Sequence, residues 1–281
     1  MLWQRARPLL GTLVSIYVRT PEVTSLVDAD VRVAMEAAFD VIAHIGRVMS
    51  AHHPESDLAR LSRATPASNL TLDPHTVAVL TCAQHWQRVS GGAFDPSTAA
   101  VRLLQKGWRP GLSMTTPSSG VGLQALRVLS ATSVRVDHAL CLDLGGIAKG
   151  YAVDQAVAVL TQHGITSALV NAGGDMRAIG PHVWRLDVRH ADRSVRDRQM
   201  CGLRGLCHAA VATSVAGVNN PEFVASIASM RRSTAWQSAT VQAHDCLTAD
   251  VLTKWALQSS RVCPSLTTNL RKHGARMWRS L

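Results

Sequence analysis

The sequence predicts an α+β fold, a single domain over residues 1–281 in which mixed or antiparallel sheets are flanked by helices. Size and composition are the first observation: 281 residues, 47% hydrophobic and 17% charged, can bury a large core and exclude a disordered chain. The second observation is that segments of helical periodicity and segments of strand periodicity both occur. The third observation is that these segments do not follow the steady strand–helix alternation of a doubly wound sheet.

The expected elements follow from periodicity and from capping and turn residues. The predicted helices are 30–49, 58–63 with Asp57 as its cap, 74–89 after Asp73, 148–163 ending at Gly164, 249–258 and 266–273. The predicted strands are 10–18, a pair made of 126–136 and 139–142, 167–171, 176–179, 184–188, 209–213, 239–243 and 275–278. The stretch 107–122 is rich in Gly, Pro, Ser and Thr and is predicted to be a surface loop.

Composition also limits the partners and the location. The formal net charge of +10 suggests anionic ligands, but aromatic residues make up only 4%, so no nucleic-acid partner is expected. No apolar run reaches the roughly 18 to 20 residues of a membrane span, so no transmembrane segment is expected. Six scattered cysteines without a CxxC pair, and no cleavage site after the basic N-terminus, favour a cytoplasmic protein.

The stretch from Asp143 to Asp154, DLGGIAKGYAVD, carries the densest chemical signal. Two glycines lead from a strand into a predicted helix, whose first N–H groups and Lys149 would face an anion. Asp154 lies within reach of a ribose hydroxyl or a base edge. The motif is neither GxGxxG nor a Walker A loop, so neither standard nucleotide fold is implied. A tight strand-to-helix turn with a solvated lysine is the alternative.

A second cluster, NAGGD from Asn171 to Asp175, follows the predicted strand 167–171. Gly173 and Gly174 would form a turn from which Asp175 projects. The two Gly-Gly turns would lie at the ends of neighbouring strands, so they could form the walls of one cleft. An ordinary hairpin turn is the alternative interpretation.

Together these residues resemble the ApbE family, the FAD:protein FMN transferases. DLGGIAKGYAVD followed by NAGGD is similar to the central signature of that family. Further segments match in order over nearly the whole chain: Leu10-Gly-Thr12, Met49-Ser50 with Pro54-Glu-Ser56, Ser90-Gly-Gly-Ala-Phe-Asp-Pro96, Ala212-Thr-Ser214 and Ala249-Asp250.

The resemblance implies an activity and a set of site residues. Such an enzyme cuts FAD at its pyrophosphate and transfers FMN to a Thr or Ser hydroxyl of an acceptor flavoprotein, with Mg²⁺ stabilising the charge. The implied metal ligands are the Gly146 carbonyl and the Asp250 carboxylate. The residues implied to bind FAD or to line its cleft are Lys149, Asp154, Asp175, Gly173, Gly174, Phe94, Asp95, Thr213, Ser214 and His52.

The sequence departs from the family pattern at three places. The family's His-x-x-Asp-Pro-x-Thr-Gly is missing, since the interval 215–237 contains no histidine, and the catalytic base is therefore unknown. In the family's Asp-x-x-x-Thr the threonine is replaced by Lys254, whose i, i+4 spacing from Asp250 favours an ion pair. Its ammonium would take part of the metal's role or simply neutralise Asp250. His52 stands where the family has a stacking tyrosine.

Two functions stay open at this point. The first is an active flavin transferase that uses FAD and Mg²⁺. The second is a carrier or redox module that binds FAD or FMN without transferring it, which the missing histidine motif and Lys254 would explain. His244 is a candidate base, although a strand-end histidine in a satisfied hydrogen bond is the alternative. The sequence does not identify the acceptor protein or the oligomeric state.

Overall fold

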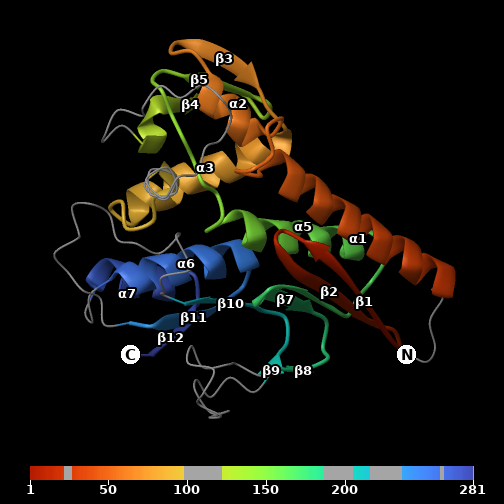
Figure 1. Ribbon diagram of the computed structural model, residues 1–281. Helices are drawn as coiled ribbons and strands as arrows, with labels where there is room; N and C mark the ends of the chain where they lie inside the picture. Colours follow the sequence, from red (N-terminus) through yellow and green to blue (C-terminus); the bar gives the residue numbers. More distant parts are fainter. Residues whose placement is uncertain (22–26, 98–121, 187–204, 216–235, 260–262, 281) are drawn as a thin grey trace.

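The computed structural model describes residues 1–21, 27–97, 122–186, 205–215, 236–259 and 263–280, and it has the predicted α+β fold. Figure 1 shows the layers: helices α5 (Ala148–Gln162) and α6 (Cys246–Gln258) lie over one large sheet. Helix α1 (Asp28–Val48) packs along α5, and α3 (Pro74–Val89) lies on the side of these helices away from the large sheet.

The large sheet has seven strands in the order β1-β2-β6-β7-β10-β11-β12, and each neighbouring pair is antiparallel. Its strands are β1 (Leu2–Leu9), β2 (Thr12–Arg19), β6 (Ala168–Ala172), β7 (Asp175–Ile179), β10 (Ala210–Val215), β11 (Ser238–Ala243) and β12 (Arg276–Ser280). Side chains alternate between the two faces of this sheet. One face meets α5 and α6, and on the other face Leu169 and Val211 pack with Trp184 and Leu206.

Smaller elements complete the described part of the chain. A second sheet has the order β3-β5-β4, and a short ribbon pairs β8 with β9. The bounds are β3 (Ser68–Thr71), β4 (Leu126–Val128), β5 (Ser133–Val136), β8 (Trp184–Arg185), β9 (Gly205–Leu206), the 3₁₀ helix η1 (Gly122–Ala125), α2 (Asp57–Arg63) and α7 (Pro264–Lys272). Among the described residues, no helix combines the length and apolar character needed to cross a bilayer.

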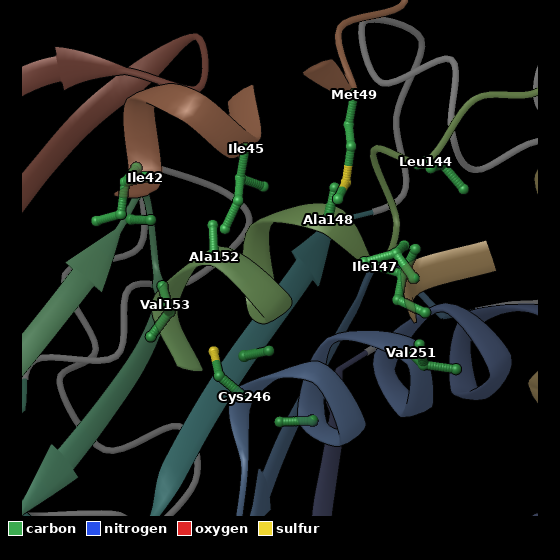
Figure 2. Packing of buried hydrophobic residues seen from close by; sticks show 14 of the residues in the cluster. Ile42, Ile45, Met49, Leu144, Ile147, Ala148, Ala152, Val153, Cys246 and Val251 are labelled. Atoms are coloured by element: carbon green, nitrogen blue, oxygen red, sulfur yellow. The ribbon is translucent and has the colours of Figure 1, made fainter. Parts of the chain in front are cut away.

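The main hydrophobic core includes the region where α1 and α6 each pack against α5. Figure 2 shows Ile42 and Ile45 from α1 above Ala152 of α5, with Val251 of α6 below. The small residues of α5 let its neighbours approach closely. The core therefore fixes α5, whose first turn carries Lys149, against the helix that carries Asp250.

Local signals explain why these helices begin and end where they do. The Asp73 carboxylate accepts a hydrogen bond from the N–H of His75 at 2.9 Å, and Pro74 occupies the first helical position, as predicted for α3. Helix α5 ends before Gly164, whose φ of +80° is the left-handed conformation that glycine adopts readily.

Three sequence predictions were wrong in detail. The N-terminus forms a hairpin in which Leu10 and Gly11 turn with positive φ between β1 and β2, rather than one strand over 10–18. Strand β1 was missed because it lies at the sheet edge and its polar side chains obscure the alternation.

The short helix α2 is capped by Ser56, whose hydroxyl accepts from the N–H of Ala59 at 3.0 Å, and not by Asp57. The segment 139–142 forms no strand; β4 and β5 pair with each other within 126–136, and β3 completes that sheet. The predicted loop 107–122 lies outside the described residues except for Gly122, and so does 187–188 of the predicted strand 184–188.

Gly150 provides a test of the α5–α6 packing. A Cβ at this position would lie 2.5 Å from the carbonyl oxygen of Cys246 and 2.9 Å from the Cβ of Asp250. We expect Gly150→Ala to lower the free energy of unfolding by about 1–3 kcal/mol, because α6 must move despite the better helix propensity of alanine. Urea denaturation followed by circular dichroism measures the loss.

Ala158→Gly is the matched control, because Ala158 is exposed on the same helix. It removes a Cβ outside the interface and should cost only about 0.5–1 kcal/mol through helix propensity. A Gly150→Ala chain as stable as the native one would contradict close packing at this crossing.

Candidate functional site

The loop before α5 brings two predicted motifs together. The N–H of Gly145 donates to the Asp143 carboxylate at 2.9 Å, which fixes the Gly-Gly turn. The N–H of Asp143 donates to the carbonyl of Pro96 at 3.1 Å, which joins this turn to the Phe94–Pro96 segment. Gly146 lies against the Phe94 ring, since a Cβ built on Gly146 would be 3.5 Å from its Cε2. The Gly-Gly turn and the Phe94–Pro96 segment, which the sequence analysis assigned to one cleft, therefore lie side by side.

The first charged pair of the site joins Lys149, in the first turn of α5, to Asp175 at the start of β7. Their Nζ and Oδ2 atoms are 2.9 Å apart, and Asp175 is buried while the Lys149 side chain is 28% exposed. Burial raises the pKa of the Asp175 carboxyl, and the charge of Asp250 raises it further; Lys149 and Lys254 lower it. Lys149 is thus anchored at one side and accessible at the other.

The turn before Asp175 is the hairpin that connects β6 to β7. Gly173 and Gly174 have φ angles of +66° and +106°, which residues other than glycine rarely adopt. A Cβ at Gly173 would lie 2.6 Å from the hydroxyl of Thr12, so this turn packs on the end of the N-terminal hairpin. The hairpin interpretation is confirmed, and the same turn carries Asp175 to Lys149.

The second charged pair joins Asp250 and Lys254, one turn apart on α6, and both are buried. The Lys254 ammonium also donates to the Ser214 hydroxyl at 2.7 Å. The other carboxylate oxygen of Asp250 accepts from the N–H of Gly150 at 3.2 Å. The ion pair expected from the i, i+4 spacing is confirmed, but its link to Ser214 has no signal in the sequence.

The two pairs belong to one electrostatic cluster. Asp250 and Lys254 both act on the pKa of Asp175 across the space between α6 and β7. Burial raises the pKa of Asp143, against the Gly145 hydrogen bond and the charges of His52 and Lys254, which lower it. His52 therefore lies near Asp143, although its side chain is otherwise exposed. The cluster combines carboxylates and lysines beside a helix N-terminus, an arrangement suited to phosphate chemistry.

Asp154 has contacts other than those the sequence predicted. Its two oxygens accept from the N–H groups of Cys246 and Leu247, each at 2.9 Å, and one of them also binds Arg177 at 2.8 Å. Both N–H groups belong to the first turn of α6, so Asp154 holds that helix end against α5 and β7. Burial raises its pKa, while the two backbone hydrogen bonds lower it. A contact between Asp154 and FAD remains a prediction.

Thr213 and Ser214 do not lie together. Ser214 faces α6 and its hydroxyl is 2.7 Å from that of Thr253, whereas the Thr213 hydroxyl meets Thr240 at 3.0 Å. Adjacent residues of a strand point to opposite faces, and Val211, two positions before Thr213, packs in the core on the far face. The structure thus brings Ser214 into the cluster and leaves Thr213 on the other side of the sheet.

Asp95 and His244 complete the predicted residues. The Asp95 carboxylate accepts from the N–H and the hydroxyl of Ser97, at 2.9 and 2.6 Å, and so stabilises its own turn beside Phe94. His244 is exposed at the end of β11. The sequence analysis missed Arg177, which forms an ion pair with Asp154. Arg177 lies two positions after Asp175 and hence on the same face of β7, so this spacing could have identified it.

We expect Asp154→Ala to lower the free energy of unfolding by about 3 kcal/mol or more, because it leaves Arg177 and two N–H groups of α6 without their partner. Chemical denaturation measures the change. Asp137→Ala is the matched control, since Asp137 also binds arginines, Arg127 and Arg135, but at the surface, where ion pairs contribute little. Equal effects of the two substitutions would contradict the role assigned to Asp154.

Comparison with known proteins identifies the family. A protein of Treponema pallidum named FAD:protein FMN transferase is 31% identical over 196 residues, which are 63% of this chain and 52% of that protein. One of the same name from Chlamydia trachomatis is 30% identical over 153 residues, 50% of this chain and 47% of that protein. The chain thus spans about half the length of these curated relatives.

The fold has solved counterparts as well. The crystal structure of an ApbE protein from Thermotoga maritima superposes with a TM-score of 0.75 at 23% identity, covering 99% of this chain and 94% of that one. The model of the family described as "ApbE family" matches residues 10–260, which include every site residue discussed above. The chain therefore belongs to the ApbE family.

Proposed function

We propose that this protein transfers FMN from FAD to a Thr or Ser hydroxyl of an acceptor protein. Family membership and the name of the relatives support this activity. The observation that carries it is the Lys149–Asp175 pair at the N-terminus of α5, set between the two Gly-Gly turns. A partly exposed ammonium at the positive end of a helix dipole favours the binding of a pyrophosphate.

The chemistry is a phosphoryl transfer. The acceptor oxygen attacks the FMN phosphorus, the bond from that phosphorus to the bridging oxygen breaks, and AMP leaves with that oxygen while the hydroxyl proton goes to a base or to solvent. Catalysis of this kind depends on positioning and on charge stabilisation. Lys149 supplies positive charge in the first turn of α5, and Asp175 fixes its ammonium in place.

The remaining predicted residues are assigned from their positions. Gly173 and Gly174 would let the backbone approach FAD, and Phe94 and His52 would flank the isoalloxazine ring near Asp143. Asp95 would act by stabilising the turn beside Phe94, and Ser214 by holding the ammonium of Lys254. Thr213 supports the sheet and Asp154 holds α6, and a direct contact of either residue with FAD stays a prediction from the resemblance.

The magnesium ion implied by the resemblance does not fit the contacts of its predicted ligands. One oxygen of Asp250 is bound to the Lys254 ammonium and the other to the N–H of Gly150. In the described part of the chain, moreover, no three His, Cys, Asp or Glu side chains gather as a metal-binding cluster. The transfer proposed for this chain therefore uses no metal ion at Asp250.

The replacement of the family's threonine by Lys254 also favours a second function. A flavin carrier or redox module that has lost transfer chemistry would bind FAD with the same cleft and release no AMP. Residues 216–235, which make up most of the interval without the family's histidine motif, lie outside the described residues. For location we propose the cytoplasm, supported by the five described cysteines, which are all free.

Incubation of the full chain with FAD and an acceptor flavoprotein domain separates the two functions. We expect flavin fluorescence that stays on the acceptor in a denaturing gel, together with one AMP released per flavin attached, measured by chromatography. An acceptor whose target Thr or Ser is replaced by alanine should stay unlabelled. Bound FAD without AMP release would reject the transferase and favour the carrier.

We expect Lys149→Ala to weaken FAD binding by about tenfold or more, because a charge-assisted contact to the pyrophosphate is lost. Quenching of flavin fluorescence measures the affinity. Lys272→Ala is the matched control, since Lys272 is exposed in the last turn of α7 and should leave the affinity unchanged. If Lys149→Ala also leaves it unchanged, Lys149 is a solvated lysine and not a phosphate ligand.

A further inference from the structure

We propose that the ammonium group of Lys254 takes the place of the divalent cation beside Asp250, so that the chain itself provides the positive charge at this site. The proposal concerns the site of the proposed function and rests on that function only for its consequences for transfer. It is carried by the contacts of three groups: the Asp250 carboxylate, the Gly146 backbone and the hydroxyls next to them.

The carboxylate of Asp250 has its partners within the chain. Lys254 Nζ binds Oδ1, and the N–H of Gly150 donates to Oδ2 at 3.2 Å. Asp250 is fully buried, and Lys254 is 4% exposed. A buried carboxylate must be neutralised, and here an ammonium one helical turn away does so.

The stem of Lys254 runs beside the other predicted ligand. A Cβ built on Gly146 would lie 3.3 Å from Lys254 Cγ and 3.5 Å from its Cε. Both residues that the resemblance implies as metal ligands, Gly146 and Asp250, therefore lie next to one lysine side chain. Glycine at 146 leaves the room that this stem occupies.

The hydroxyls around the ammonium are also engaged. Thr253 donates to the carbonyl of Asp250 at 2.7 Å, so Ser214 donates its own proton to Thr253 across 2.7 Å. Ser214 then accepts from Lys254 at 2.7 Å. The ammonium is thus held by the Asp250 carboxylate and by the Ser214 hydroxyl, whose orientation is fixed.

Charge balance leads to a test. A divalent cation next to Asp250 would meet the ammonium of Lys254 at close range, and like charges in a buried site repel strongly. Replacing Lys254 by a neutral residue leaves the Asp250 carboxylate buried without a counter-charge, which a hard cation with oxygen ligands can supply. Removal of Lys254 should therefore create metal affinity rather than destroy it.

The experiment measures Mn²⁺ binding to the purified full chain without FAD, by the loss of the free Mn²⁺ signal in electron paramagnetic resonance. We expect Lys254→Thr to bind Mn²⁺ at least about tenfold more tightly than the native chain. Lys272→Thr, the same change at an exposed lysine of α7, should bind as the native chain does. Mg²⁺ should compete for the new site.

Asp250→Asn identifies the ligand. In the native background it should leave Mn²⁺ binding unchanged, and in Lys254→Thr it should remove the gain. Native binding as tight as that of Lys254→Thr, lost in Asp250→Asn, would overturn the proposal by showing that Lys254 yields to the metal. If circular dichroism shows that Lys254→Thr does not fold, Lys254→Gln provides a second neutral variant. Mn²⁺ titrations of the native chain and of Asp250→Asn still test the proposal, since tight native binding that Asp250→Asn removes would overturn it.

These measurements do not depend on transfer. A chain that attaches no flavin can still gain Mn²⁺ affinity on losing Lys254, so failure of the proposed function and failure of this proposal are distinguishable. If transfer occurs, the native rate should change less than about twofold in EDTA, whereas any rate of Lys254→Thr should require added Mg²⁺.

Discussion

The crossing of α5 over α6 is the contact on which the candidate site depends. Gly150 lets the two helices approach until its N–H reaches the carboxylate of Asp250, and four residues later Asp154 binds the first N–H groups of α6. Two connections in opposite directions thus fix both the distance and the rotation of the helices. As a result Lys149 and Lys254, which are more than 100 positions apart in the sequence, belong to one cluster.

Buried ion pairs contribute little net stability, because the loss of hydration offsets most of their attraction. The role of the pairs Lys149–Asp175 and Lys254–Asp250 is to position the two lysine ammonium groups. Each holds an ammonium at a fixed place near the Gly-Gly turns, one partly exposed and one buried. A site whose charges are already oriented needs less rearrangement when a phosphate develops charge during transfer. The proposed replacement of a metal by Lys254 extends the same principle.

Local signals allowed much of this structure to be predicted from the sequence. Asp73-Pro74 and Gly164 marked helix ends, and DLGGIAKGYAVD placed Lys149 in the first turn of α5. The Asp250–Lys254 pair followed from helical spacing. Contacts between distant segments could not be predicted, because no periodicity encodes them. Examples are the N–H groups of α6 that Asp154 binds and the bond from Lys254 to Ser214.

A crystal structure of the native chain grown with FAD and Mn²⁺, with anomalous data collected at the manganese edge, tests the central claim most directly. The account predicts the pyrophosphate at the N-terminus of α5 within hydrogen-bond reach of Lys149, and Lys254 still bound to Asp250 with no manganese on that carboxylate. A manganese peak coordinated by Asp250 and the Gly146 carbonyl, with the Lys254 ammonium displaced, would contradict it.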